Sequence, residues 1–313
     1  MNWTTSNIPS QTGRRAVITG ANSGIGFHAA LELARHGAEV ILPARTQEKA
    51  SDAIRRIQVE VPTARLIPAI LDLASLNSVR SFARFYGERY PGQSLDLHIN
   101  NAGVGAIPKR ELTVDGYERQ IATNYIGPFA LTALLFPHLK PQPYTRIVTI
   151  ASMVVHRAKI DFDNLHSERK YDYFDATYSQ SKLANLIFAI ELQRRLSAAG
   201  SLIMSVSAHP GLAATNIFKN ATGLFRVLLS ILTPILAQDA AHGALPTLFA
   251  ATSPDVHPGG YYGPNGSSER KGYPASARIP ATAEDRTVAK RLWSESERLT
   301  GVVFDPPPVA QGS

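Results

Sequence analysis

A tyrosine and a lysine four residues apart, Tyr178 and Lys182, begin an apolar run that continues to Ile190. If this run is helical, the two side chains lie on one face, because residues four apart are about one turn apart. A phenol has a reference pKa of about 10, and an ammonium held nearby lowers that pKa towards the working range of a general acid or base. The spacing alone is a weak signal, since an exposed tyrosine beside a solvated lysine would show it too.

The composition describes an ordinary globular protein and excludes several kinds of site. The chain has 313 residues, of which 44% are hydrophobic and 18% are charged, enough for one large α/β domain or two small ones. It has no cysteine, which excludes disulfides, thiolate metal sites and cysteine nucleophiles. The nine histidines show no close ligand spacing, so we expect no metal site. No secretory signal is visible, and we expect a cytoplasmic protein.

The net charge of +7 is spread along the chain in pairs of cations such as Arg14-Arg15 and Arg55-Arg56. A basic stripe or cluster is typical of nucleic-acid-binding proteins. The sequence shows neither, so no nucleic-acid partner is expected. An anionic cofactor, or a peripheral contact with an anionic membrane surface, explains the charge better.

Short β-rich runs alternate with helical ones from residue 14 onward. Strands are expected at residues 15–19, 39–42, 65–71, 95–99, 146–150 and 202–207, and helices at 27–36, 47–59, 76–90, 117–139, 283–300 and from Tyr178 onward. Strands separated by amphipathic helices imply right-handed βαβ units and a parallel sheet covered on both faces. The expected fold is therefore α/β, a doubly wound parallel sheet in one domain.

The first expected strand runs directly into a helix through a glycine-rich segment, residues 19–26 with the sequence TGANSGIG. In such a loop one glycine makes the turn, one lets the backbone approach a pyrophosphate, and one lets the helix pack on the strand. The phosphates would then lie at the N-terminus of the helix, where unpaired N–H groups favour an anion. The strand before and the helix after it favour a nucleotide loop over an ordinary glycine-rich turn.

An arginine, Arg45, follows the second expected strand, where sites selective for NAD place a carboxylate on the ribose 2′-hydroxyl. A guanidinium suits a 2′-phosphate instead. NADP is therefore the expected cofactor and NAD the second choice. The alternative is that Arg45 is a solvated loop cation.

With Asn100-Asn101-Ala102-Gly103 after the fourth strand, Ser152 after the fifth, and the Tyr178–Lys182 pair, the chain resembles the short-chain dehydrogenase/reductase superfamily. The matches follow one another in order from about residue 14 to residue 262. The resemblance implies a Rossmann fold, a nicotinamide cofactor and oxidoreductase activity.

Within that superfamily the chain resembles the retinol dehydrogenase-like branch and its bacterial relatives. The reasons are the separation of 26 residues between Ser152 and Tyr178, and the turn His209-Pro210-Gly211 followed by Thr215.

The resemblance implies a catalytic tetrad of Asn124, Ser152, Tyr178 and Lys182. It also implies a cofactor site made of Gly20, Asn22, Ser23, Gly24, Ile25, Gly26, Arg45, Asp72, Leu73, Asn101, Ala102, Gly103, Tyr178, Lys182, Pro210, Gly211 and Thr215. Asn124 would hold a water that links Lys182 to solvent. Many NADP-selective members carry a basic residue in the glycine loop where this chain has a serine.

These roles agree with the chemistry of hydride transfer. Transfer from a nicotinamide to a carbonyl carbon leaves negative charge on the oxygen. Ser152 and Tyr178 can both donate to that oxygen, and Tyr178 can deliver the proton. Lys182 would keep the pKa of Tyr178 low and bind the nicotinamide ribose. A light-dependent protochlorophyllide reductase type of C=C reduction is an alternative, although those enzymes are thought to use a cysteine. A non-catalytic dinucleotide-sensing protein on the same fold is another.

The substrate side is expected after the sixth strand, where a lid of about residues 212–237 would lie. It contains an apolar run, Leu224–Leu236, which is shorter than the roughly 20 residues needed to cross a bilayer and is interrupted by Arg226 and Pro234. A lid of this kind predicts a lipophilic aldehyde, ketone or alcohol as substrate. The alternative is a helix buried against the core or a neighbouring subunit. The insertion 157–175 is expected to frame the same entrance.

The domain limits follow from these elements. Residues 1–13 are expected to be an N-terminal extension, 14–300 the catalytic domain, and 301–313 a disordered Pro-rich tail. The superfamily often forms dimers or tetramers through the helices around Phe129 and Leu186, so a homo-oligomer is expected.

Overall fold

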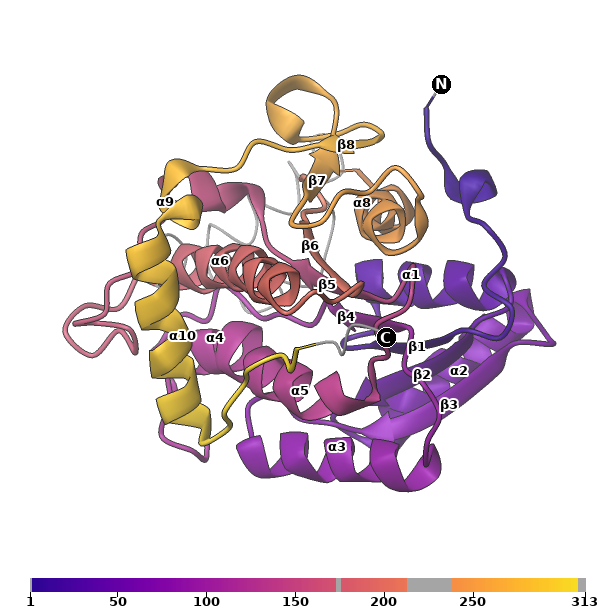
Figure 1. Cartoon of the computed structure of the whole chain (residues 1–313), viewed down its shortest axis with the longest axis horizontal. Coiled ribbons are helices and arrows are strands. Elements are labelled where there is room, and N and C mark those ends of the chain that lie inside the picture. Colours follow the sequence, from indigo (N-terminus) through magenta and orange to yellow (C-terminus); the bar gives the residue numbers. More distant parts are fainter. Residues whose placement is uncertain (1, 173–175, 213–237, 309–313) are drawn as a thin grey trace.

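Eight strands form one sheet at the centre of the computed structural model, which describes residues 2–172, 176–212 and 238–308. In sheet order they are β3 (Arg65–Ile70), β2 (Glu39–Ala44), β1 (Arg15–Ile18), β4 (Leu97–Asn100), β5 (Arg146–Ile150), β6 (Met204–Ala208), β7 (Tyr261–Pro264) and β8 (Pro274–Ser276). All neighbours pair in parallel except β7 and β8, which pair antiparallel. The predicted doubly wound α/β class is confirmed (Figure 1).

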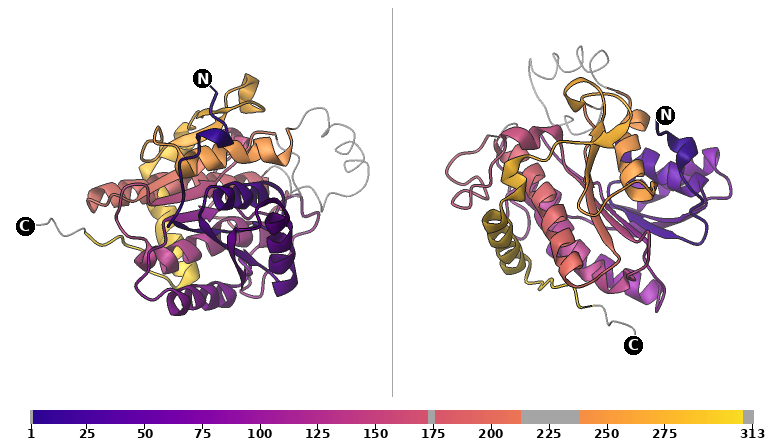
Figure 2. Two further views of the ribbon diagram at one scale, coloured as in Figure 1. Left: turned by 90° about the vertical axis from the view of Figure 1, so that its right-hand side faces the viewer. Right: turned by 45° about the horizontal axis from the view of Figure 1, so that its top comes forward.

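Helices cover both faces of the sheet. They are α1 (Gly24–Arg35), α2 (Gln47–Glu60), α3 (Leu76–Arg89), α4 (Arg119–Ile121), α5 (Gly127–Leu135), α6 (Ala176–Ala198), α8 (Ala240–Thr252), α9 (Ala281–Glu284) and α10 (Arg286–Thr300). Buried residues of α1 and α8 form one apolar cluster with the sheet, and those of α3, α5, α6 and α10 form the other. Figures 1 and 2 show the strands between these two groups of helices.

The predicted helix 117–139 forms as one helical run from Arg119 to His138, but it is not α-helical throughout. Between α4 and α5 the backbone forms a π-helical turn, η2 (Ala122–Ile126), and α5 is followed by a 3₁₀ turn, η3 (Phe136–His138). Pro128, at the start of α5, lacks the N–H that an α-helix needs, and its ring crowds the preceding turn. A side chain at Gly127 would collide with the backbone oxygen of Leu73. The start of α5 therefore lies against the backbone just after β3.

The predicted helix 283–300 is two helices, α9 and α10. Asp285 interrupts it and caps α10, because its carboxylate accepts hydrogen bonds from the backbone N–H groups of Thr287 and Val288. At the other end of the chain, the N-terminal extension packs against α8: Trp3 lies edge-on to Phe249, with ring centroids 5.4 Å apart.

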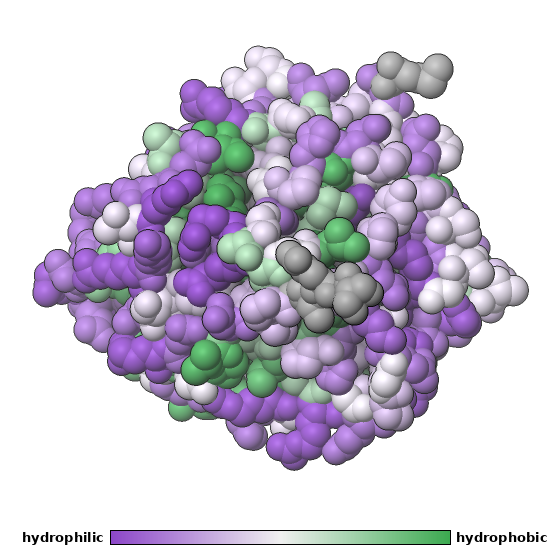
Figure 3. Space-filling view, in the orientation of Figure 1, coloured by the Kyte–Doolittle hydropathy of each residue, from purple (hydrophilic) through white to green (hydrophobic). Residues whose placement is uncertain are grey.

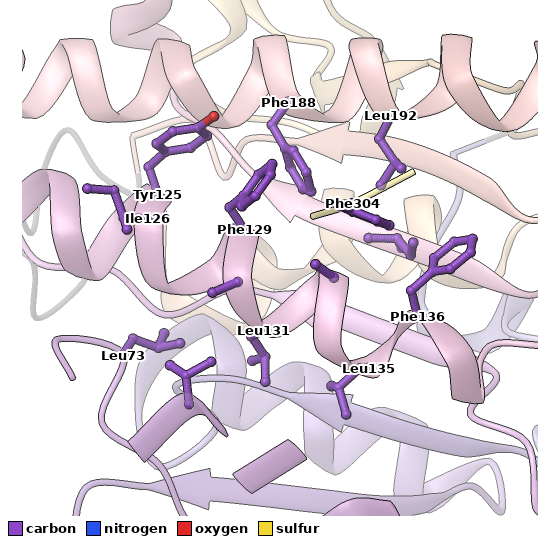
Figure 4. Packing of buried hydrophobic residues seen from close by; sticks show 14 of the residues in the cluster. Leu73, Tyr125, Ile126, Phe129, Leu131, Leu135, Phe136, Phe188, Leu192 and Phe304 are labelled. Carbon is purple, nitrogen blue, oxygen red and sulfur yellow. The ribbon is translucent and has the colours of Figure 1, made fainter. Parts of the chain in front are cut away.

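The C-terminal tail differs from the expectation of disorder in its first part. Phe304 is only 3% exposed and stacks on Trp293 of α10, with ring centroids 5.2 Å apart. Its ring also lies near Phe129 and Phe136, and Figure 4 shows it between α5 and α6. Residues 309–313 lie outside the described part of the chain.

This packing bears on the expected subunit interface. Phe129 and Leu186 have no exposed surface in the single chain, and Trp293 of α10 lies edge-on to Phe129 at 5.2 Å. The chain's own C-terminal helix and Phe304 thus pack against α5 and α6, the helices on which the expectation placed a second subunit, and the homo-oligomer stays a prediction.

The Phe304→Ala variant is expected to lose about 3 kcal/mol of unfolding free energy, because it removes a buried ring and leaves a cavity between two helices. The matched control is Val303→Ala, at a side chain that is 84% exposed, which should change stability by less than about 0.5 kcal/mol. Urea unfolding followed by tryptophan fluorescence measures both. Equal stability of the two variants would show that the tail does not contribute to the core.

None of the described helices is long and apolar enough to cross a bilayer. The apolar run 224–236 lies outside the described residues. The face seen in Figure 3 is mostly hydrophilic and carries small, separate apolar patches.

Candidate active site

A cleft of about 890 Å³ lies at the carboxyl ends of the strands. In the sheet order, β1 has β2 on one side and β4 on the other, so the strand order reverses at this point. Ligands of open α/β sheets bind at such a reversal. The predicted cofactor residues in the described ranges all line the cleft, as do Ser152, Tyr178 and Lys182. Asn124 does not line it, and Thr215 lies outside the described residues.

The glycine-rich loop has the close contacts that its sequence predicts. Gly20 has a positive φ of 70°, and a Cβ atom there would lie 2.9 Å from the Cα atom of Ala102. A Cβ atom at Gly26 would collide with the side chain of Asn101 and the backbone oxygen of Gly20. By contrast, a Cβ atom at Gly24 would meet no atom within 4 Å, which leaves room for a phosphate beside the loop.

The loop ends at the N-terminus of α1, which suits an anion. Ser23 is the N-cap residue, yet its side chain makes no capping hydrogen bond. The first N–H groups of the helix are therefore free of a side-chain cap, and the positive end of the helix dipole lies at the cleft. This arrangement fits the pyrophosphate of a dinucleotide.

Thr19 is a loop-positioning residue to which the sequence analysis assigned no role. Its buried hydroxyl accepts hydrogen bonds from the backbone N–H groups of Asn101 and Ala102, each at 3.0 Å. Asn101 in turn donates from Nδ2 to the Thr19 backbone oxygen at 2.8 Å. These bonds join the end of β1 to the end of β4 and set the floor of the cleft.

Two cations line the cleft where β2 ends. Arg45 was predicted, and Lys49, in the first turn of α2, was not. Lys49 lies four positions after Arg45 in the sequence, and this closeness was the signal available for it. Asp72, on the same side of the cleft, already accepts a hydrogen bond from the backbone N–H of Ala74 at 3.0 Å.

The tetrad residues come from three elements. Tyr178 and Lys182 lie one turn apart in α6, both buried, with the lysine Nζ 6.0 Å from the centre of the tyrosine ring. Ser152 follows β5, and its side chain lies near the Tyr178 hydroxyl, where it acts to lower the pKa of that phenol. Lys182 donates from Nζ to the backbone oxygen of Ile150 at 3.0 Å. The hydroxyls of Ser152 and Tyr178 can therefore both reach one substrate oxygen.

Asn124 supports the site from behind. It lies in the π-helical turn η2 and has no exposed surface. Its Oδ1 accepts from the backbone N–H of Val104 at 2.8 Å, and its Nδ2 donates to the Val104 oxygen and to Ser181 Oγ, both at 2.9 Å. A Cβ atom at Gly103 would lie 3.3 Å from Lys182 Nζ and 3.4 Å from Asn124 Oδ1. Asn124 thus fixes the backbone at Gly103 and Val104, which lies between Asn124 and Lys182.

The charge states differ from the expectation. Burial raises the pKa of Tyr178 to about 12, although the hydrogen bond with Ser152 acts in the opposite direction. Burial also lowers the pKa of Lys182 to about 8. The expected low pKa of Tyr178 is therefore not found, because burial outweighs the effect of Ser152 and no effect of Lys182 on this pKa is resolved. The phenol is held protonated at neutral pH, which suits a proton donor.

The substrate side of the cleft is apolar near Ser152, where Met153, Val154 and Leu212 line it. No described residue of the insertion 157–172 lines the cleft, contrary to the expectation that the insertion frames its entrance. Tyr171 instead donates to the backbone oxygen of Ile107 at 2.6 Å. The expected lid segment 213–237 and the aromatic residues at 173–174 lie outside the described residues.

Within the described ranges, no group of three His, Asp or Glu side chains is placed to hold a metal ion.

Comparisons with known proteins agree with this geometry. A family model described as short chain dehydrogenase matches residues 14–223. Retinol dehydrogenase 13 of Homo sapiens is 38% identical over 298 residues, which cover 93% of this chain and 85% of that protein. Polyprenol dehydrogenase of Mus musculus is 36% identical over 298 residues, which cover 94% and 86%. A crystal structure of an uncharacterised protein from Mycobacterium paratuberculosis matches with a TM-score of 0.80 and 38% identity, covering 98% of this chain and all of that one.

Proposed function

The chain belongs to the short-chain dehydrogenase family, and on that basis we propose that it is an NADP(H)-dependent reductase of lipophilic aldehydes or ketones. The family and its relatives make it an oxidoreductase of the alcohol dehydrogenase type. The observation that carries the finer proposal is the pair of hydroxyls, Ser152 and Tyr178, in a cleft that extends to a phosphate loop and two cations.

Each residue of the site has its own role in the proposed reaction. The bound nicotinamide supplies or accepts the hydride. Ser152 Oγ and Tyr178 Oη donate hydrogen bonds to the carbonyl oxygen and stabilise the negative charge that develops there. Tyr178 then gives its proton to that oxygen. Lys182 lies beside the phenol and Gly103, where its ammonium can stabilise the phenolate that remains.

The direction of reaction is proposed from the cofactor. Where NADPH is abundant, hydride passes from the cofactor to the carbonyl, and the protein would act as a reductase. In that direction Tyr178 gives a proton, and burial keeps the phenol protonated at neutral pH.

The preference for NADP is proposed from Arg45 and Lys49. The Arg45→Ala variant should bind NADPH roughly 10 to 100 times more weakly, because a charge-assisted contact to the 2′-phosphate is lost, while NADH binding changes little. Arg55→Ala is the matched control, because it removes an arginine that lies in α2, outside the cleft lining. Fluorescence titration with both cofactors measures the change. An equal loss for NADH and NADPH, or tighter binding of NADH by the wild type, would contradict the assignment.

The lipophilic substrate class is supported by the apolar residues Met153, Val154 and Leu212 beside the catalytic serine. It is also supported by relatives that are named as retinol and polyprenol dehydrogenases. Loss of NADPH absorbance with all-trans-retinal, a medium-chain aldehyde and a small polar aldehyde tests it. We expect the two lipophilic compounds to be reduced with the lower KM, and a preference for the polar one would contradict the proposal.

A further inference from the structure

The backbone carbonyl of Ser152 has a partner outside the cleft. β5 ends at Ile150, and the last hydrogen bond between β5 and β6 runs from the Ala151 N–H to the Ala208 oxygen at 2.9 Å. Ser152 therefore stands just beyond the sheet. The N–H of Val154 reaches Ser152 Oγ only at 3.4 Å, which is a weak restraint.

Tyr261, the first residue of β7, adds a second donor to the Ser152 carbonyl, which already accepts from the backbone N–H of Val155 at 3.2 Å. The Tyr261 side chain is buried, and its hydroxyl donates to the Ser152 backbone oxygen at 3.1 Å. Tyr261 is absent from the lining of the cleft, so its hydroxyl holds the serine carbonyl from outside the cleft. Burial raises the pKa of this phenol well above its usual value, which keeps it a neutral donor.

A histidine fixes the Tyr261 ring in turn. The fully buried imidazole of His209 lies 5.1 Å from the Tyr261 ring, measured between ring centres. Its Nδ1 accepts from the backbone N–H of Gly211 at 3.2 Å, and its Nε2 lies 3.0 Å from a carboxylate oxygen of Glu269. With Nδ1 as the acceptor, Nε2 carries the proton and donates to Glu269. Any side chain at Gly263 would collide with this imidazole.

The backbone is bent so that Glu269 reaches the histidine. Ser268 and Glu269 both have positive φ values, 53° and 55°, a conformation uncommon for residues other than glycine. Conformations of this kind persist only where the surroundings fix them, and they gather at functional sites. The second Glu269 oxygen accepts from the backbone N–H of Arg278 at 2.9 Å, so the carboxylate is held from both sides.

We propose that Tyr261 is a positioning residue for Ser152. Its hydroxyl, fixed through the His209–Glu269 pair, holds the serine carbonyl so that Oγ faces the Tyr178 hydroxyl. This inference rests on the proposed function, because it concerns the orientation of a residue in that reaction.

The test is the Tyr261→Phe variant, which removes one hydroxyl and keeps the ring. With NADPH and all-trans-retinal we expect kcat to fall about 10-fold, while the Kd for NADPH and the KM for retinal stay within about twofold. Tyr262→Phe is the matched control: this neighbour in β7 is also buried, and its hydroxyl accepts from the backbone N–H of His257 at 2.8 Å. The control should keep the wild-type kcat.

A double-mutant cycle separates positioning from general stability. In a Ser152→Ala background there is no serine hydroxyl to orient, so adding Tyr261→Phe should lower kcat no further. If Tyr261→Phe fails to fold, Glu269→Gln replaces it in the same cycle. A smaller loss of kcat is expected, because the carboxamide of the new glutamine can still accept from His209.

The outcomes separate this inference from the proposed function. If the wild type is active and Tyr261→Phe has an unchanged kcat, the role of Tyr261 is overturned and the proposed function stands. The same holds if the loss of kcat in Tyr261→Phe multiplies fully with the loss in Ser152→Ala. A wild-type protein that binds NADPH and reduces no carbonyl overturns the proposed function and this inference together.

Discussion

Replacing Tyr178 with phenylalanine is expected to lower turnover about 1,000-fold and to leave NADPH binding within about threefold of the wild type. The variant keeps the buried ring and removes only the group that gives its proton to the carbonyl oxygen. The phosphate loop and the two cations at the end of β2 are untouched, so the cofactor keeps those contacts. Steady-state kinetics with NADPH and all-trans-retinal, together with fluorescence titration, measure both quantities.

Tyr125→Phe is the matched control for this variant. Tyr125 is also a buried tyrosine, but its hydroxyl pairs with Ser296 Oγ at 2.6 Å, outside the lining of the cleft. It should lose some stability and keep its turnover. A Tyr178→Phe enzyme that retains most of the wild-type kcat would show that this phenol is not the proton donor.

Replacing Lys182 with methionine is expected to have two opposite effects. Turnover should fall about 100-fold or more, because the ammonium no longer stabilises the phenolate that remains after proton transfer. The cofactor-free protein should nevertheless become more stable at pH 7, since a buried charge is removed. The backbone oxygen of Ile150 keeps a partner, because Asn185 also donates to it at 3.1 Å.

The sign and pH range of this stability change follow from the lysine pKa. Burial lowers the pKa of Lys182 to about 8 in the folded protein, from an ordinary value of 10.5. Between these two pH values the unfolded chain binds the proton and the folded chain does not, so stability rises with pH. At pH 7 the buried ammonium therefore lowers the unfolding free energy of the wild type by about 3 kcal/mol, and Lys182→Met removes this loss. Above about pH 10.5 the stability gain of the variant disappears.

Urea unfolding of the cofactor-free proteins at pH 7 and pH 10.5 measures this difference. Lys290→Met, at an exposed position on α10, is the control and should show no gain that depends on pH. A Lys182→Met protein that is less stable than the wild type at pH 7 would mean that the ammonium contributes more through its contacts than its burial costs.

The sequence pattern predicted six of the eight strands because strand and helix periods differ along most of the chain, but it did not predict β7 or β8. β5 has the predicted bounds, Arg146–Ile150, because a short continuous β-rich run is typical of a strand buried in a parallel sheet. The π-helical turn Ala122–Ile126 was missed, because an apolar helical pattern does not distinguish a π-helical turn from an α-helical one. The burial of Phe304 was missed because a Pro-rich end looks disordered until its distant aromatic partners are known.

The candidate site was also predicted in part. The glycine loop and Arg45 could be predicted because they follow the first two strands directly, and the tetrad was predicted from the resemblance to the superfamily. Glu269 could not be linked to Tyr261 or Ser152 from the sequence, because β6, β7 and the following turn bring them together only in the folded chain. The direction of the Tyr178 pKa shift was also inaccessible, since it depends on burial rather than on the neighbouring lysine.

Hydride transfer can be followed directly with NADPH that carries deuterium at both C4 positions of the nicotinamide. The purified protein is incubated with this cofactor and all-trans-retinal, and the product is examined by mass spectrometry and NMR. We expect retinol with one deuterium on the carbinol carbon, and almost none of it from Tyr178→Phe. NADPH binding without any labelled alcohol from retinal or other lipophilic carbonyls, or deuterium on a former C=C carbon, would contradict the assignment as a carbonyl reductase.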